Sequence, residues 1–344
     1  MTNDKFQKMI EEVFDDEEVL VDSGEDLKVQ KTGCMSLDVS LGIGGIPVGR
    51  IVEIYGPEGS GKTSIALSIS KRAVEEGKRV LYIDVEKFLD YNVVESILGI
   101  GLPEKSFVLA KGNSAEDNFM IAEAGINSGE FDVIIFDSIG ALAPKKEQED
   151  DFGDQNIALV PRLLSKFLRR NAYTIRANHV AFIFINQVRD KVGSFFAQGY
   201  STPGGHAIKH FASIIISLTK GKELKKGDNT FGVLNTFSVR KNKLAPPFRS
   251  YQFPIVFGIG VDYLRDLLDF STMLGVVKKA GPYYKLEETT IGKGTEDSMR
   301  ALADPKNKLV LDKIEKMVYT MTRKPSRDLV DTDESVEELI DEEE

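Results

Sequence analysis

The sequence predicts an α/β protein whose core is a mainly parallel, twisted sheet flanked by helices. Three observations support this fold class. Short apolar runs alternate with amphipathic segments through the first half of the chain, as parallel strands joined by helical crossovers do. One apolar run leads directly into a glycine-rich stretch, "GPEGSGKT", and then into a helical pattern. The 344 residues are 42% apolar, which is enough for one large core with smaller appendages.

The expected elements begin with an amphipathic helix at residues 3–14, which would pack either on its own core or on another subunit. Strands are expected at 51–55, 79–84, 132–137, 180–186, 212–218, 236–242 and 250–257. Helices are expected at 63–76, 90–98 and 114–128. The later strands have no long helices between them, which predicts antiparallel additions at one edge of the sheet. Residues 263–327 change character and predict a small separate α/β lobe.

Charge divides the chain into acidic ends and a basic interior. Residues 328–344 hold ten acidic residues and no Lys or Arg, and residues 1–26 carry a net charge of −8. Because the whole chain carries −10, these two ends leave +8 for residues 27–327. We expect 328–344 to form a disordered acidic tail. It would either only keep the protein soluble or compete with nucleic-acid phosphate for the cations of the interior.

Several classes of protein are excluded by composition. No apolar run approaches the roughly 20 residues of a membrane helix, and the acidic N-terminus lacks a secretory pattern. The single cysteine, Cys34, rules out an intramolecular disulfide framework. The three histidines show no metal-ligand spacing with it. We therefore expect a cytoplasmic protein with no membrane partner.

The glycine-rich stretch matches the P-loop pattern Gly56-x-x-x-x-Gly61-Lys62-Thr63, with a strand before it and a helix after it. Its glycines let backbone N–H groups converge on phosphate oxygens at a helix N-terminus. Lys62 would reach the β- and γ-phosphates, and the Thr63 hydroxyl would bind Mg²⁺. The residues expected to bind nucleotide here are Gly56, Pro57, Glu58, Gly59, Ser60, Gly61, Lys62, Thr63 and Ser64.

Polar residues at the ends of other strands are candidates to complete this site. Asp137 ends the run "FDVIIFD" and is the expected acid on the Mg²⁺ side. Asp84 and Glu86 follow another strand, where a glutamate either deprotonates the attacking water or is only a solvated helix cap. Gln187 ends a third strand, either as a γ-phosphate sensor or as an ordinary strand-end amide.

Several stretches together resemble the bacterial recombinase RecA family. They are "SLDVSLGIGGIPVGRIVEIYGPEGSGKTS", "YIDVE", "VIIFDSIGALAPKKEQE", "FINQVRDKVG", "STPGGHAIKHFAS" and "VRKNKLAPPFR". They occur in the family's order between about residues 35 and 270, and the C-terminal lobe and acidic tail match in placement. The divergent sequence and compact ends are similar to those of phage-encoded members, for which the host cytoplasm would be the location.

The resemblance implies a RecA-type P-loop fold and an ATP-dependent recombinase. Such a protein polymerises on single-stranded DNA, pairs it with homologous duplex DNA and exchanges strands in recombination, repair and the SOS response to DNA damage. DNA-dependent ATPase activity, ATP and Mg²⁺ as cofactors, a helical filament, and single-strand-binding and loading proteins as partners are implied with it. The implied domains are 1–28 for subunit docking, 29–262 for the ATPase and DNA-binding core, 263–327 for the lobe, and 328–344 for the tail.

The resemblance also implies roles for particular residues. Glu86 would be the catalytic base and Gln187 the switch between nucleotide and DNA. Lys241 and Lys243 would reach across a subunit seam to the neighbour's γ-phosphate, although two lysines in isolation are equally consistent with a solvated strand face. Further nucleotide contacts are implied at Asp90, which would bind the adenine amino group, and at Phe257 and Gly258.

DNA contacts are implied in two loops. The first spans roughly 149–162 and continues into a helix; the second spans roughly 188–209 and is glycine-rich, polar and aromatic, which suits binding that tolerates any base sequence. The expected contacts in the first are Ile157, Arg162, Ser165, Arg169 and Arg170. Those in the second are Arg189, Val192, Phe195, Phe196, Gly204 and Gly205.

Two positions depart from the family pattern. Val93, with Tyr91 nearby, stands where the family has an aromatic residue that stacks on adenine. His210 stands where bacterial members have a phenylalanine that links subunits. Nucleotide affinity and the propagation of ATP binding along a filament are therefore expected to differ.

Three other functions are compatible with a P-loop core of this kind or use the same nucleotide chemistry. A ring helicase or related DNA motor uses the same core but unwinds a forked substrate with one polarity. A regulatory or scaffolding filament would bind nucleotide and barely hydrolyse it. A small-molecule kinase would need an acceptor-pocket motif, which the sequence does not present.

Overall fold

The computed structural model of the chain describes residues 27–99, 105–149, 159–188 and 206–323. The chain separates into two compact units between Tyr263 and Leu264, and each is described by itself. The helix expected at 3–14 and the acidic tail lie outside the described residues. The functional division of the chain at 28, 262 and 327 stays a prediction.

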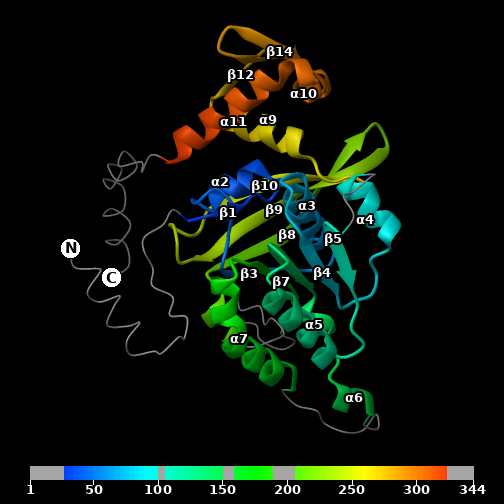
Figure 1. Cartoon of the computed structure of the whole chain (residues 1–344). Coiled ribbons are helices and arrows are strands. Elements are labelled where there is room, and N and C mark those ends of the chain that lie inside the picture. The colour runs from blue at the N-terminus through cyan, green and yellow to red at the C-terminus, as the bar shows by residue number, and fades with distance from the viewer. Residues whose placement is uncertain (1–26, 100–104, 150–158, 189–205, 324–344) are drawn as a thin grey trace, which may run out of the picture. The chain divides into compact units, whose positions relative to one another are not determined.

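The first unit is built on a nine-stranded sheet of order β11-β10-β9-β8-β3-β7-β6-β4-β5 (Figure 1). Strands β3 to β8 pair in parallel, whereas β9, β10 and β11 are antiparallel to their neighbours. The sheet strands are β3 (Ile51–Gly56), β4 (Val80–Asp84), β5 (Phe107–Ala110), β6 (Val133–Asp137), β7 (Ala181–Gln187), β8 (Ile214–Lys226), β9 (Asn229–Asn242), β10 (Ser250–Val256) and β11 (Gly260–Val261). The predicted α/β class with a mainly parallel sheet is confirmed.

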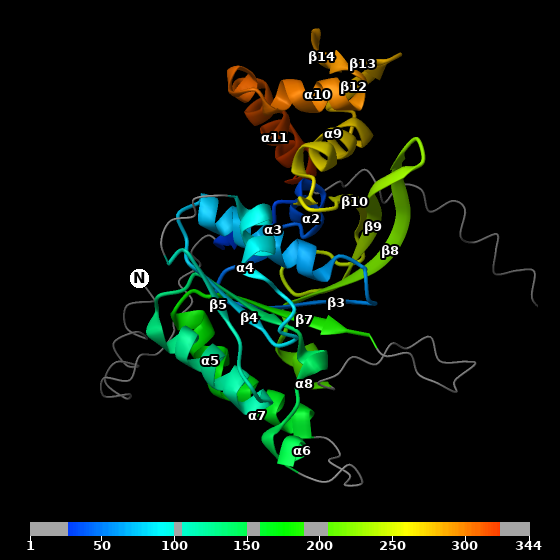
Figure 2. The ribbon, with the colours of Figure 1, turned by 90° about the vertical axis from the view of Figure 1, so that its right-hand side faces the viewer.

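Helices cover both faces of this sheet. The helices of the unit are α2 (Met35–Ser40), α3 (Lys62–Glu75), α4 (Tyr91–Leu98), α5 (Ala115–Ser128), α6 (Lys145–Glu149), α7 (Leu159–Ala177) and α8 (His206–Phe211), with a 3-10 turn η1 (Ile139–Ala141). Val52 and Ile54 of β3 pack in one buried cluster with side chains of α3 and α4, while Ile51 packs in a second cluster with α5, α7 and α8. Figure 2 shows α3 and α5 on opposite sides of the sheet. Because both faces are buried, the central strands are almost continuously apolar.

One predicted feature of the sheet is confirmed only in part. We expected the later strands to be antiparallel additions at one edge, and β9, β10 and β11 are, but β8 runs parallel to β3, with Val52 beside Ile214. The physical reason is that the chain returns to the starting edge of the sheet through α8, so it enters β8 in the same direction as β3. β8 and β9 are also longer than expected, because they form one hairpin that extends to the pair Lys226 and Asn229.

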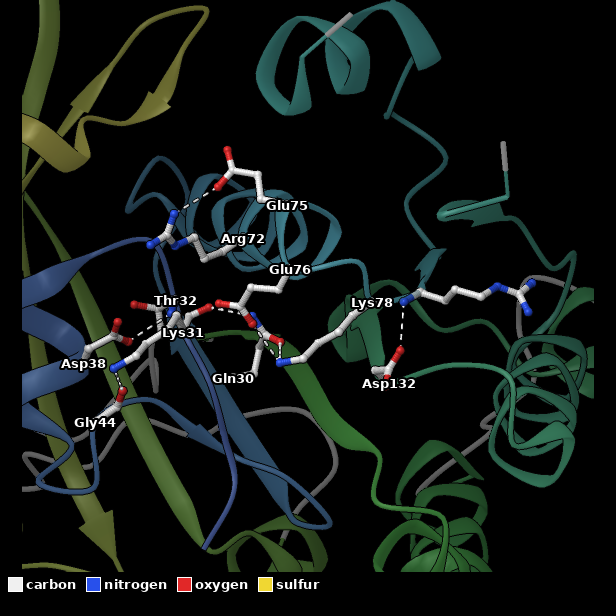
Figure 3. A network of polar contacts seen from close by, with 11 residues as sticks. Gln30, Lys31, Thr32, Asp38, Gly44, Arg72, Glu75, Glu76, Lys78 and Asp132 are labelled. Carbon is white, nitrogen blue, oxygen red and sulfur yellow. Dashed lines mark hydrogen bonds and ion pairs between the residues drawn. The ribbon is translucent and has the colours of Figure 1, made fainter. Parts of the chain in front are cut away.

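A polar network fastens the first described strand to the end of α3 (Figure 3). Strand β1 (Val29–Gln30) pairs with β2 (Ile46–Pro47) in a small sheet of its own. Lys78 Nζ donates hydrogen bonds to Gln30 Oε1 and Glu76 Oε2, both at 2.8 Å. The backbone N–H of Thr32 donates to Asp38 Oδ1 at 2.9 Å. Because Gln30, Thr32 and Asp38 are buried, these bonds satisfy polar groups that water does not reach.

The second unit combines helices with a three-stranded antiparallel sheet. Its elements are α9 (Tyr263–Met273, which starts one residue before the division), β12 (Val277–Ala280), β13 (Tyr283–Leu286), β14 (Thr289–Lys293), α10 (Gly294–Ala303), the 3-10 turn η2 (Pro305–Asn307) and α11 (Lys308–Arg323). The predicted small lobe is therefore present. Within the described residues, no helix combines the length and the apolar character needed to cross a bilayer.

Candidate nucleotide site

The loop between β3 and α3 is held in shape by its own polar groups. Lys62 Nζ donates to the carbonyl oxygens of Gly56 and Pro57 at 2.9 and 2.8 Å, and Ser60 Oγ donates to the Pro57 oxygen at 2.7 Å. Gly61 has φ 86°, and a Cβ there would lie 2.2 Å from Ile255 Cδ1. Only glycine fits this position. The loop leads directly into the N-terminus of α3, where the partial positive charge of the helix favours a bound anion.

A cavity of about 300 Å³ opens above this loop. It is lined by Glu58, Gly59, Gly61, Lys62, Thr63, Ser64, Glu86, Asp137, Gln187, Val233, Ile255 and Phe257. The sequence predicted all of these except Val233 and Ile255, which come from the antiparallel strands. Glu86, Asp137 and Gln187 meet here because the carboxyl ends of parallel strands share one edge of the sheet.

Asp137 is buried at this edge and engaged through one oxygen. Its Oδ2 accepts hydrogen bonds from Thr63 Oγ1 at 3.0 Å and from the Tyr82 hydroxyl at 2.5 Å. Burial raises the pKa of Asp137 to about 6, although the two hydrogen bonds oppose that shift. The Tyr82 pKa is also raised, chiefly by burial and then by the charge of Asp137. A carboxylate and a hydroxyl side by side are oxygen ligands of the kind that Mg²⁺ prefers, so the donor set fits that ion.

Lys62 carries the matching positive charge. Burial lowers its pKa, whereas the nearby charges of Asp137, Glu86 and Glu58 raise it. A buried cation that faces a concave surface next to a helix N-terminus is suited to a polyphosphate, because the anion restores the stabilisation that water no longer supplies.

Glu86 is held by two donors at once. Its Oε1 accepts hydrogen bonds from Gln187 Nε2 at 2.6 Å and from Ser138 Oγ at 2.7 Å. The predicted base and the predicted sensor are thus in direct contact. Ser138 was not predicted; its position directly after Asp137 was the only sequence signal for it.

Asp84, by contrast, shapes the loop that presents Glu86. It accepts hydrogen bonds from the backbone N–H groups of Lys87 and Leu89 at 2.9 and 3.0 Å, and it pairs with Lys111 at 3.2 Å. Because Asp84 is buried and these groups engage it, we assign it a supporting role.

Lys241 and Lys243 lie apart from this cavity. Lys241 pairs across β8 and β9 with Ile215, which pairs in turn with Glu53 of β3. Side chains in one cross-strand row share a face of the sheet, and Ile215 packs in the cluster opposite α3. Lys241 Nζ donates to the Lys209 carbonyl and Lys243 Nζ to the His210 carbonyl, the latter at 3.2 Å. Both lysines therefore point at the end of α8.

The remaining predicted nucleotide contacts lie around α4 and β10. Asp90 is exposed and caps α4, accepting from the Asn92 backbone N–H at 2.9 Å. Tyr91 and Val93 are exposed on the same helix. Phe257 is exposed and lines the cavity, whereas Gly258, at φ 77°, does not line it.

Of the predicted DNA contacts, four lie on α7. Arg162, Arg169 and Arg170 are exposed and Ser165 is half-buried. Arg170 is paired with Glu123 of α5 at 2.9 Å. The other predicted contacts, Ile157, Arg189, Val192, Phe195, Phe196, Gly204 and Gly205, lie outside the described residues.

The fold and this cavity define a P-loop nucleotide-binding protein of the α/β class. The family model for the RecA N-terminal domain matches residues 4–262, and that for the RecA C-terminal domain matches residues 265–323. Protein RecA of Clostridioides difficile (strain 630) is 40% identical over 278 residues, covering 81% of this chain and 79% of the relative. Protein RecA of Bacillus subtilis (strain 168) is 38% identical over 280 residues, with 81% and 80% covered. The chain belongs to the RecA family.

A solved structure agrees with this fold. The crystal structure of the RadB recombinase matches with a TM-score of 0.52 and 23% identity, covering 68% of this chain and 98% of that one. At this identity the likeness concerns the fold alone. Family membership identifies an ATP-binding recombinase and does not favour the helicase alternative.

Proposed function

We propose that this protein polymerises on single-stranded DNA, pairs it with homologous duplex DNA and exchanges strands, and that it hydrolyses ATP to ADP and phosphate as it does so. The observation that carries the proposal is the placement of Lys241 and Lys243. Lys241 lies on the face of the sheet opposite α3, in the cross-strand row of Glu53 and not in that of Gly56, and Lys243 donates to the His210 carbonyl at the end of α8. The row of Glu53 lies three residues, or about 10 Å, along β3 from Gly56 at the start of the P-loop. Because these lysines are displaced from their own P-loop and point to the other face of the sheet, we assign them to the nucleotide of a neighbouring subunit.

Within one subunit, the P-loop and its partners bind the triphosphate. Lys62 leaves the carbonyl groups of its own loop for the β- and γ-phosphates. Thr63 and Asp137 hold Mg²⁺, which when bound would neutralise triphosphate charge. Asp90 and the exposed side chains near it contact the base.

Glu86 acts as the general base, and Gln187 controls it. In the contact of 2.6 Å the sensor amide donates to one of the two carboxylate oxygens of Glu86, so a water cannot donate to that oxygen at the same time. A γ-phosphate offers Gln187 a competing acceptor. When the amide turns to it, Ser138 alone holds Glu86 in place.

A neighbour completes the site. Head-to-tail contacts that do not close generate a helical filament, and residues 1–28 provide the docking segment. Lys241 and Lys243 then stabilise charge on the transferring phosphoryl group in the manner of arginine fingers. RecA-family proteins bind DNA and form filaments, and here the exposed cations of α7 and residues 188–209 hold the strand. Single-strand-binding and loading proteins are proposed partners.

Mixing two inactive variants tests the seam. Lys62→Ala cannot hold its own nucleotide but still offers Lys241 to a neighbour, and Lys241→Ala is its complement. ATPase assays with single-stranded DNA should find each variant inactive alone and the mixture partly active. Lys220→Ala, an exposed lysine of β8, is the matched control and should stay active. Absence of any recovery in the mixture contradicts the shared site, and unwinding of a forked duplex without strand exchange would favour a helicase.

A further inference from the structure

Glu53 is a buried acid that the proposed mechanism does not use. It lies in the middle of β3, the strand that leads into the P-loop, and is 1% exposed. Its cross-strand neighbours are Phe184 on β7 and Ile215 on β8. A carboxyl group among apolar strands is costly unless it is hydrogen-bonded or paired, so its presence calls for a role.

A line of hydrogen bonds runs from Glu53 to the phosphate cavity. Asn186 Nδ2 donates to Glu53 Oε1 at 2.9 Å, and Asn186 Oδ1 accepts from the Gln187 backbone N–H at 3.0 Å. Gln187 Nε2 then donates to Glu86 Oε1 at 2.6 Å. The orientation of the Asn186 amide is chemically fixed, because a carboxylate needs its NH₂ group and a backbone N–H needs its oxygen. Glu53 thereby sets the orientation of the residue that precedes the sensor.

The same carboxyl group lies on the face of the sheet that carries Lys241. Burial raises the pKa of Glu53, while the Asn186 hydrogen bond and the charges of Lys209 and Lys241 lower it. Lys241 occupies the same cross-strand row, two strands away, and its amino group donates to the Lys209 carbonyl of α8. One side chain thus contacts the end of β7 and acts electrostatically on α8, the two elements that flank residues 189–205 in sequence.

We propose that Glu53 is a positioning residue that couples the nucleotide sensor Gln187 to helix α8 and Lys241. This inference rests on the proposed function, because it presumes that Gln187 senses nucleotide and that DNA stimulates turnover. Movement of Gln187 toward a γ-phosphate pulls on Asn186, and Glu53 passes that displacement to α8 through its charge. Glu53 touches no substrate, so its loss changes the response to DNA more than the binding of ATP.

Substitutions separate positioning from mere packing. Glu53→Gln keeps the shape and the acceptor for Asn186, whereas Glu53→Leu removes both the acceptor and the charge. We expect Glu53→Leu to lower the kcat of DNA-stimulated ATP hydrolysis about tenfold or more, with the KM for ATP changed less than threefold. Glu53→Gln should lose most of the stimulation as well, because it keeps the acceptor for Asn186 but removes the charge that acts on α8. Asn171→Leu, which removes another buried amide from the same side of the sheet, is the control. It should lower the melting temperature without changing stimulation by DNA.

A double-mutant cycle keeps the inference testable if Glu53→Leu folds poorly. Asn186→Ala cuts the same line at the next link, so its loss of stimulation should equal that of Glu53→Leu. The double variant should lose no more than either single one. Additive losses, a fall in melting temperature that accounts for the whole effect, or full stimulation in Asn186→Ala would each overturn the proposal.

Failure of the proposed function looks different. In that case the unmodified protein itself shows no stimulation by single-stranded DNA, and Gln187→Ala changes nothing. If the unmodified protein is stimulated and Gln187→Ala abolishes the response while Asn186→Ala and Glu53→Leu retain it, only the coupling through Glu53 is wrong.

Discussion

The two faces of the central sheet use lysine in contrasting ways. On the α3 side, Lys62 folds back onto the carbonyl groups of the loop that it serves. On the other side, Lys241 and Lys243 donate to carbonyl groups at the end of α8, away from the cavity. Each lysine rests on backbone oxygens, but only Lys62 rests beside its own nucleotide site. In the proposed mechanism this difference means that one protomer holds all the groups for binding ATP and only some of those for its hydrolysis.

Substitution of Glu86, the proposed general base, should have the largest effect on turnover. Glu86→Gln keeps an acceptor for Ser138 but cannot take a proton, so DNA-stimulated turnover should fall by roughly 10² to 10⁴-fold. ATP binding, followed with a fluorescent analogue, should stay within a few-fold of normal. Turnover within tenfold of normal would remove Glu86 from its assigned role.

Substitution of Lys241 tests the proposed role of the lysines on the face of the sheet opposite α3. Lys241→Ala should lower turnover about 10² to 10³-fold, while the Kd for ATP of the isolated protomer stays unchanged. Lys62→Ala should raise that Kd sharply. Equal loss of ATP affinity in the two variants, measured in dilute protein, would mean that both lysines serve the same site.

The buried carboxylate of Asp137 should lower the stability of the nucleotide-free protein at high pH. Its pKa is raised to about 6 from 3.8, so the folded state holds the neutral acid more readily than the unfolded chain does. The stability that this preference contributes is complete below pH 3.8 and is lost as the pH rises through about 6. Asp137→Asn should therefore stabilise the nucleotide-free protein at pH 8 by on the order of 2 kcal/mol.

Denaturant melts in EDTA at pH 8 and pH 5 measure this effect. The advantage of the Asn variant should shrink at pH 5, where the unmodified acid is largely protonated. An advantage of the same size at both pH values would show that the charge of Asp137 is not its cause.

Tyr82 should have a smaller effect. Tyr82→Phe removes one donor to Asp137 and leaves Thr63 in place, so the Mg²⁺ concentration for half-maximal turnover should rise roughly tenfold. Direct Mn²⁺ binding provides a readout that does not depend on turnover. Tyr251→Phe, in β10, is the matched control. Unchanged metal affinity in Tyr82→Phe would make the buried phenol a packing residue only.

Arg170 should have the smallest effect. Arg170 is exposed where it pairs with the half-buried Glu123, so Arg170→Ala should change the free energy of unfolding by less than about 1 kcal/mol. If Arg170 also meets DNA phosphate, the slope of log affinity against log salt should fall by roughly 0.7. An unchanged slope would limit Arg170 to the contact with α5.

The sequence predicted the cavity well because its chemistry is local or follows from strand ends. The P-loop is one continuous stretch, and parallel strands bring Asp137, Glu86 and Gln187 to one edge. What it missed depends on register. Neither the parallel entry of β8 nor the row that joins Glu53 to Lys241 can be found without knowing which residues pair.

The sequence also could not reveal buried contacts between residues that are far apart along the chain. Tyr82 reads as an ordinary core residue until its hydroxyl is placed 2.5 Å from Asp137. Val233 and Ile255 reach the cavity from antiparallel strands that share no motif with the P-loop. The DNA contacts predicted beyond α7 lie outside the described residues and stay predictions.

The hydrogen bond between Gln187 and Glu86 has a consequence for the economy of the cell. In the proposed mechanism the Glu86 oxygen that Gln187 and Ser138 engage is withheld from water until a γ-phosphate draws the amide away. A protomer away from DNA would then consume little ATP, so a cell could hold a large reserve of it at small metabolic expense.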